Sequence, residues 1–227
     1  MPAPISLIIP TLNAQKNLPL CLSSLLPGLS DGLIREVIVS DGGSQDATMS
    51  LAESAGSEIV KGPAGRGGQL KRGAEVARGD WLLFLHADTA LSPDWAERVA
   101  AHIARHPGHA AAFKLVYRSD DAGARWLEAR ANRRARWLGL PYGDQGLLVS
   151  RALYDEVGGF RDMPLMEDVA IIRAIGRPRI RLLAVEARTS AEKYERDGWR
   201  KRAYSNAWLI TRYFLGASPE KLAREYR

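Results

Sequence analysis

Short apolar segments that alternate with helical patterns are the feature that most limits how this chain can fold. Residues 5–10 (ISLIIP), 36–40 (EVIVS) and 81–85 (WLLFL) are rich in apolar and β-branched side chains, which is typical of buried strands. Residues 58–61 predict a further strand, and helical patterns separate these segments. This order favours βαβ units around a parallel sheet, in which neighbouring strands end at the same edge.

The second half of the chain is less regular but still mixes strands and helices. Residues 110–117 and 179–187 predict strands, and 143–150 predicts a turn followed by a strand. Helices are predicted at 124–138, 167–175 and 199–215. No internal repeat, low-complexity stretch or linker is evident, so we expect one composite α/β domain.

Composition narrows the compartment and the partners. With 227 residues and 46% hydrophobic content, the chain is long enough for one domain with a substantial core. Its net charge of +6 favours anionic partners such as nucleotides, phosphates or acidic lipids. The single cysteine, Cys21, is expected in the core. No segment reaches the roughly 20 apolar residues of a membrane span, and no signal peptide is evident, so we expect a cytoplasmic protein.

Polar side chains follow three of the predicted strands where each strand ends. The first strand leads into Thr11 and Asn13, and the second leads into Asp41. The strand at 81–85 leads into His86 and Asp88. Helix capping explains any one of these ends equally well, whereas three polar ends at one sheet edge favour a shared pocket.

Four segments, in this order and spacing, resemble family 2 glycosyltransferases, which have the GT-A fold. They are PTLN at 10–13, EVIVSDGGSQDAT at 36–48, GRGGQLKRGAEVARGDWLLFLHADT at 65–89 and MEDVAIIR at 166–173. The HADT, GDQG and LMED segments are most similar to a small bacterial subgroup often found beside radical-SAM genes. The resemblance implies a mostly parallel sheet flanked by helices, with a helical tail. Its expected parts are a nucleotide-binding half at 1–90, an acceptor half at 91–195 and the tail at 196–227.

The resemblance also implies a site for a nucleoside-diphosphate sugar, with a UDP-sugar favoured over a GDP-sugar. Asp41 would bind the base. Pro10, Thr11 and Asn13 would line the nucleotide pocket. Arg66 would approach the base or the phosphates.

A divalent metal, Mg²⁺ or Mn²⁺, is the cofactor that the resemblance implies. Asp88 falls on the last acid of the family's metal-binding DxD motif, whereas His86 stands where an acid is usual. A hard ion prefers oxygen ligands, and it would neutralise the charge of the departing diphosphate. Asp88 is therefore the expected ligand, with His86 as a second candidate.

An inverting transferase needs a base that takes the proton of the acceptor hydroxyl. The resemblance assigns this role to Asp168, with Glu167 second; a simple preference of acids for a helix N-terminus would also explain the pair. Asp144 and Gln145, in GDQG, resemble an acceptor-side turn. The acceptor itself is left open as a small molecule or a lipid-linked one.

Two basic, aromatic helices leave alternatives open. Trp126, Arg130, Arg133 and Trp137 fall on one stripe of the helix at 124–138. Three interpretations of this stripe remain open. In the simplest, the arginine stems pack on the tryptophans. The stripe would otherwise make peripheral membrane contact through 125–137, at the inner membrane face, or form a wall over an anionic acceptor. The aromatic helix at 199–215 suits a helix covered by the domain or by a second copy of the chain. No recognition motif suggests nucleic acid.

Two rival functions remain open at this point. A nucleotidyltransferase shares such a sheet but usually carries a glycine-rich, basic loop after its first strand, where this chain has TLNA. A sugar-nucleotide-binding protein that has lost catalysis is the other rival, because His86 replaces an acid.

Overall fold

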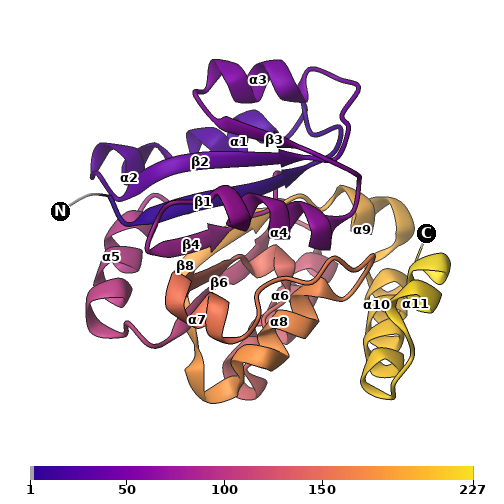
Figure 1. The fold of residues 1–227 in the computed structure, drawn as a ribbon. Coiled ribbons are helices and arrows are strands. Elements are labelled where there is room, and N and C mark those ends of the chain that lie inside the picture. The colour runs from indigo at the N-terminus through magenta and orange to yellow at the C-terminus, as the bar shows by residue number, and fades with distance from the viewer. Residues whose placement is uncertain (1–2, 227) are drawn as a thin grey trace.

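An eight-stranded sheet with helices on both faces carries the fold in the computed structural model, which describes residues 3–226 (Figure 1). The strands are β1 (Ile5–Thr11), β2 (Ile34–Asp41), β3 (Glu58–Lys61), β4 (Trp81–Phe84), β5 (Thr89–Leu91), β6 (Ala110–Tyr117), β7 (Leu147–Ser150) and β8 (Ile180–Thr189). The helices are α1 (Leu18–Ser23), α2 (Leu26–Ser30), α3 (Thr48–Ser54), α4 (Arg66–Val76), α5 (Trp95–Arg105), α6 (Ala122–Leu138), α7 (Arg151–Glu156), α8 (Glu167–Ile175), α9 (Glu192–Asp197), α10 (Trp199–Phe214) and α11 (Pro219–Glu225). Two 3₁₀ turns, η1 (Gly143–Gln145) and η2 (Arg177–Arg179), complete these elements.

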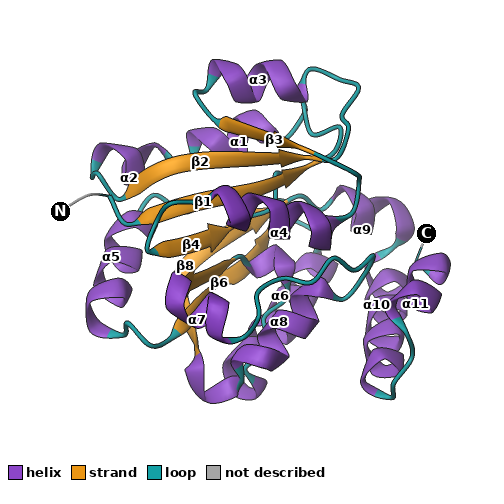
Figure 2. Cartoon of the chain, in the orientation of Figure 1, coloured by secondary structure: helices purple, strands orange, loops and turns teal. Residues whose placement is uncertain are grey.

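The first half of the chain forms the parallel part of the sheet, as Figure 2 shows. β1 pairs in parallel with β2 and β4, and β2 pairs in parallel with β3. In this register Thr11 lies beside Asp41 at the ends of their strands. The predicted α/β class and the shared carboxyl edge of these strands are therefore confirmed.

The second half adds strands in both directions. The order across the sheet is β3-β2-β1-β4-β7-β6-β8-β5. β7 is antiparallel to both of its neighbours, β6 is parallel to β8, and the short β5, which the sequence pattern did not predict, is antiparallel to β8. The sheet is thus continuous across both halves of the chain, and the N-terminal strands β1 to β4 form its larger parallel part.

Two layers of helices bury the two faces of the sheet. Ile5, Leu7 and Ile9 of β1 pack towards α1, α3 and α5. Ile8, whose side chain points the opposite way, packs towards α4, α7 and α8. α4 approaches β1 closely at Gly73, because a Cβ there would lie 2.5 Å from Cγ2 of Ile8. The central parallel strands β1 and β4 are consequently buried on both faces, which explains their continuous apolar sequences.

α6 takes the place of a strand along part of β6. β6 and β7 share only one register pair. Beyond it, Glu128 accepts the N–H of Tyr117 at 2.6 Å, and the Asn132 amide bonds both the N–H and the C=O of Leu115, at 2.8 and 2.9 Å. These side chains satisfy backbone groups that would otherwise be lost in the interior, and they fix α6 beside the sheet edge.

The helical tail packs beside the sheet rather than on it, at the right of Figure 1. Leu209 of α10 and Leu222 of α11 are buried against Met166 and Val169, which flank the start of α8. Several aromatic side chains of α10 remain exposed, so the domain covers this helix only in part, and cover by a second copy stays a prediction. Within residues 3–226 no helix combines the length and apolar character needed to cross a bilayer.

Candidate active site

Asp41 is the best-satisfied carboxylate at the strand edge. It is only 2% exposed. Its Oδ1 accepts hydrogen bonds from Oγ1 of Thr11 at 2.9 Å and Oγ of Ser44 at 2.5 Å, and its Oδ2 accepts the N–H groups of Gly43 and Ser44 at 2.8 Å. Burial acts to raise the pKa of Asp41, but these hydrogen bonds outweigh it and hold that pKa below its usual range. Asp41 therefore fixes the loop after β2.

The loops after β1 and β2 are joined to each other. Asn13 adopts a left-handed backbone conformation, with φ of 50°. Its side-chain oxygen accepts the N–H of Gln45 at 2.9 Å, and its own N–H donates to Ser44 at 2.8 Å. These hydrogen bonds join the two loops at the sheet edge, and we call Thr11, Asn13 and Asp41 together the ridge.

Gln69 of α4 is hydrogen-bonded to the ends of both β1 and β2. Its buried amide donates to the carbonyl oxygens of Thr11 and Ser40, at 2.7 and 2.8 Å. Pro10 pairs with Ser40 in the register of β1 and β2. Sequence reasoning did not single out Gln69, although it lies within the GRGGQ segment that carried the resemblance.

His86 and Asp88 lie in the turn between β4 and β5. Oδ1 of Asp88 accepts the hydroxyl of Thr189 at 3.3 Å, which ties this turn to the end of β8. Burial, together with the nearby Arg66, lowers the pKa of His86 to about 4, so its imidazole is neutral at pH 7. The carbonyl of His86 accepts the thiol of Cys21 at 3.5 Å, and Cys21 is buried in the core as predicted.

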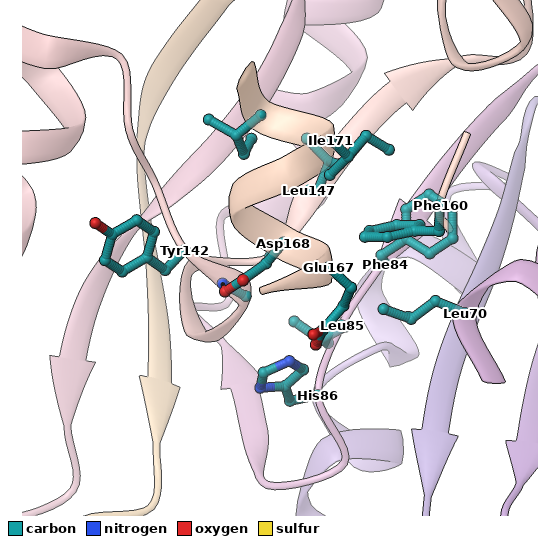
Figure 3. A pocket seen from close by; sticks show the side chains of 13 residues that line it. Leu70, Phe84, Leu85, His86, Tyr142, Leu147, Phe160, Glu167, Asp168 and Ile171 are labelled. Atoms are coloured by element: carbon teal, nitrogen blue, oxygen red, sulfur yellow. Dashed lines mark hydrogen bonds between the residues drawn. The ribbon is translucent and has the colours of Figure 1, made fainter. Parts of the chain in front are cut away.

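Glu167 and Asp168 open α8 and face His86, as Figure 3 shows. Oδ1 of Asp168 accepts the N–H of Val169 at 2.7 Å, and its Oδ2 accepts the N–H of Gly143 at 2.8 Å. Each oxygen keeps further lone-pair capacity, because a carboxylate offers about four acceptor positions. Asp168 is thus held in a fixed orientation while it remains able to accept a proton.

Glu167 differs from Asp168 in its surroundings. It is buried and lies 3.5 Å from Nη1 of Arg66, whose side chain is about half exposed. Burial and the neighbouring Asp168 raise the pKa of Glu167. Arg66 begins α4, so this ion pair joins two helices and brings a cation among the acidic side chains.

The GDQG turn places its two polar side chains on opposite sides. Oδ1 of Asp144 is buried with no hydrogen-bond partner among residues 3–226, and burial raises the pKa of Asp144 to about 6. Gln145 is fully buried, and its amide donates to the carbonyl of Phe113 at 3.0 Å. Gln145 therefore supports the turn from inside, and the acceptor-side role of the turn stays a prediction.

A cleft of about 870 Å³ runs from these residues towards α6 and α10. Its inner end is lined by Arg66, His86, Asp88, Asp144 and Asp168. Its walls carry aromatic, apolar and basic side chains of α6, α8 and α10. Thr11, Asn13 and Asp41 do not line it, so the structure does not bring all of the predicted site residues into one cavity.

The sequence from 6 to 162 matches the model of the family described as Glycosyl transferase family 2. The chain belongs to this family. The smaller HADT/GDQG/LMED subgroup stays a prediction. A PGL/p-HBAD biosynthesis glycosyltransferase of Mycobacterium bovis is 38% identical over 115 residues, a match that covers 47% of this chain and 44% of that protein. The match therefore spans less than half the length of this curated relative.

Solved structures resemble this family 2 glycosyltransferase over most of its length. TarS of S. aureus (residues 1–349) has a TM-score of 0.65 at 20% identity, over 83% of this chain and 60% of the other. Glucosyl-3-phosphoglycerate synthase of Mycobacterium tuberculosis, solved with Mn²⁺, UDP and phosphoglyceric acid, has a TM-score of 0.58 at 23% identity, over 82% and 69%. These likenesses confirm the expected GT-A fold.

Proposed function

We propose that this chain moves a sugar, with inversion, from a nucleoside-diphosphate sugar to a hydroxyl group of an acceptor. One observation supports the proposal: in a family 2 glycosyltransferase, Arg66, His86 and Asp88 line the same cleft as the carboxylates that open α8. A UDP-sugar is the favoured donor, because the similar synthase of Mycobacterium tuberculosis was solved with UDP and Mn²⁺.

The donor's nucleotide would lie along the ridge of Thr11, Asn13 and Asp41. The Asp41 carboxylate already accepts four hydrogen bonds. A base would therefore exchange with the Ser44 hydroxyl or bind the backbone of this rigid loop. Arg66, at the first residue of α4 and half exposed, is placed to meet the diphosphate at the inner end of the cleft.

The donor set at the end of β4 fits a divalent ion that takes most of its ligands from the substrate. Among residues 3–226, no three His, Cys, Asp or Glu side chains cluster closely enough to hold a metal by themselves. Asp88 offers a carboxylate, and His86 offers an imidazole that is neutral at pH 7. Diphosphate oxygens and water would complete the ligands of Mg²⁺ or Mn²⁺. When bound, the ion would stabilise the negative charge of the leaving diphosphate.

Asp168 is the proposed base. The acceptor oxygen attacks the anomeric carbon while its proton passes to Asp168, and the bond from that carbon to the diphosphate breaks. The N–H groups of Gly143 and Val169 hold the Asp168 carboxylate in place for this transfer. Glu167 is buried and paired with Arg66, so we assign it a positioning role on the donor side.

The acceptor would enter through the cleft. Asp144 lines it and has a buried oxygen that finds no partner in the described part of the chain, so this oxygen is suited to accept a hydrogen bond from an acceptor hydroxyl. The acceptor's class, small molecule or lipid-linked, is not assigned by this contact.

Release of nucleoside diphosphate from a panel of UDP- and GDP-sugars, with Mn²⁺ present, tests the proposal. We expect the wild type to release UDP and the Asp88→Ala variant to lose at least about 99% of that rate, by analogy with the loss of one strong electrostatic contact at a reacting centre. Asp31→Ala, an exposed residue at the end of α2, is the matched control. Equal release by wild type and Asp88→Ala would reject the metal assignment.

A further inference from the structure

Two exposed stripes of the same helical spacing flank the cleft. On α6 the stripe is Trp126, which is half-buried, Arg130, Arg133 and Trp137; on α10 it is Tyr204, Trp208 and Thr211, and it continues to Leu215 directly after the helix. Both have offsets of 4, 7 and 11 residues, which fall on one side of an α-helix. We call the eight residues together the aromatic rim.

The aromatic rim is unusually open to solvent for its composition. Trp137, Tyr204, Trp208 and Leu215 have exposed fractions of 64%, 65%, 61% and 80%. Large aromatic side chains at such exposure, gathered on neighbouring helices, mark a surface that is built to contact something. Trp137, Tyr204 and further rim members line the cleft, so the rim surrounds its mouth.

The same two helices hold the positive charge of the chain. α6 and α10 contain nine basic side chains and one acidic one, whereas the whole chain has a net charge of only +6. Five of the basic side chains are exposed and form no ion pair with an acidic side chain within residues 3–226: Arg130, Arg133, Arg136, Arg200 and Lys201. Aromatic and basic groups therefore occupy one surface, and the rest of the chain carries a slight excess of acid.

This combination matches the chemistry of an anionic bilayer surface. Tryptophan and tyrosine favour the boundary between lipid headgroups and acyl chains, where an apolar ring and a polar edge are both satisfied. Exposed arginine and lysine side chains bind acidic headgroups electrostatically. A helix that lies on a membrane buries its aromatic and apolar side chains at the boundary between headgroups and acyl chains, while its basic side chains lie on the polar face.

We propose that the aromatic rim docks on an anionic lipid bilayer, so that the cleft opens towards the membrane surface. The docking rests on the exposed residues of α6 and α10 alone. Only the statement that an acceptor enters there rests on the proposed function.

Vesicle flotation tests the docking. The full chain is mixed with vesicles of equal parts phosphatidylcholine and phosphatidylglycerol, or of phosphatidylcholine alone, and the bound fraction is measured. We expect binding to the mixed vesicles, little binding to phosphatidylcholine alone, and loss of binding in high salt. A wild-type chain that stays unbound with both vesicles would overturn the proposal.

Charge and aromatic variants locate the surface. Arg130→Glu/Arg133→Glu is expected to weaken binding to the mixed vesicles at least about thirtyfold. The matched control, Arg105→Glu/Arg181→Glu, changes the net charge equally at exposed residues of α5 and β8 and is expected to change binding less than about threefold. If both double variants lost vesicle binding equally, binding would depend on net charge and not on this surface, and the proposal would be overturned.

Trp208→Ala/Leu215→Ala removes two rim residues that do not line the cleft, and we expect at least about tenfold weaker vesicle binding. Leu26→Ala/Leu29→Ala, on the exposed side of α2, is its control. A rim variant that converts a dimer into a monomer in light scattering, with unchanged flotation, would show an interface between copies and overturn the proposal. RNA binding that is lost with the rim, without vesicle binding, would do the same.

Donor hydrolysis without vesicles separates this proposal from the proposed function. We expect Trp208→Ala/Leu215→Ala to release UDP at the wild-type rate while it fails to float. Asp88→Ala should float normally while it fails to release UDP. If Asp88→Ala loses flotation although it remains folded, the rim is not the docking surface.

Discussion

The ends of β1 and β2 and the turn before β7 differ in how completely their polar groups are satisfied. At the ends of β1 and β2, the Asp41 carboxylate accepts four hydrogen bonds and the loops are fixed to each other through Asn13. In the turn before β7, by contrast, Asp144 has a buried oxygen that no group within residues 3–226 hydrogen-bonds, beside a cleft of about 870 Å³. The polar groups of the ridge bond to one another, whereas Asp144 lies beside an open cleft.

This difference has a physical consequence for the reaction. A rigid, satisfied loop loses little conformational entropy when a ligand binds, which suits recognition of a constant group such as a nucleotide. An open cleft with an unpartnered carboxyl oxygen gains more from a ligand that fills it. Asp168, held by two backbone N–H groups, lines this cleft.

The largest effect on the reaction rate is expected from a change at Asp168. Asp168→Asn removes the proposed base but keeps the size of the side chain, so the rate of sugar transfer or donor hydrolysis should fall at least about a hundredfold. Binding of UDP should change little, because the ridge is untouched. Rates of UDP release check this, with Asp120→Asn, on an exposed loop, as control. Release within about threefold of wild type would remove Asp168 from the role of base.

Loss of the Asp41 carboxylate should destabilise the fold at the ends of β1 and β2. Asp41→Ala leaves the Thr11 and Ser44 hydroxyls and two backbone N–H groups without their acceptor, so the free energy of unfolding should fall by about 2 to 3 kcal/mol. Urea unfolding measures the change. Asp31→Ala should stay within about 0.5 kcal/mol of wild type. An equally small effect of Asp41→Ala would show that the loop is not fixed by this residue.

A methyl group at Gly143 tests how tightly the acceptor side is packed around the reacting groups. A Cβ there would lie 2.8 Å from Nε2 of His86 and 3.4 Å from Oδ2 of Asp168, so His86 must shift in Gly143→Ala. We expect kcat for donor hydrolysis to fall about tenfold with little change in stability. Gly108→Ala, where a Cβ meets open space, is the matched control. Identical kcat values for the two variants would show that this geometry is not needed.

The smallest effect concerns the pH dependence of stability. The pKa of His86 is about 4 in the folded chain and about 6.5 when unfolded, so between these values the unfolded chain binds the extra proton. The free energy of unfolding should therefore fall as the pH drops from about 7 to about 5, on the order of 1 kcal/mol through His86. His86→Gln should lose that part of the fall in urea unfolding. The same slope in wild type and variant would place the proton uptake elsewhere.

Local patterns were enough to predict one half of the site and not the other. The strand ends at Thr11, Asp41 and Asp88 follow from apolar segments in a parallel sheet, because parallel strands must end at the same edge. Gln145 could not be placed from GDQG, since adjacent residues of a tight turn point to different sides. The cleft depends on how α6 and α10 pack, a contact between segments far apart in the sequence.

Thermal unfolding with UDP and Mn²⁺ tests most directly the central claim, that the donor nucleotide binds through a metal at Asp88 and does not need the base Asp168. At saturating UDP and Mn²⁺ we expect the wild-type Tm to rise by roughly 5 to 10 °C, and Asp168→Asn to show the same rise. Asp88→Asn should show little rise, as should the wild type with UDP and EDTA. A full rise in Asp88→Asn, or its loss in folded Asp168→Asn, would contradict the account.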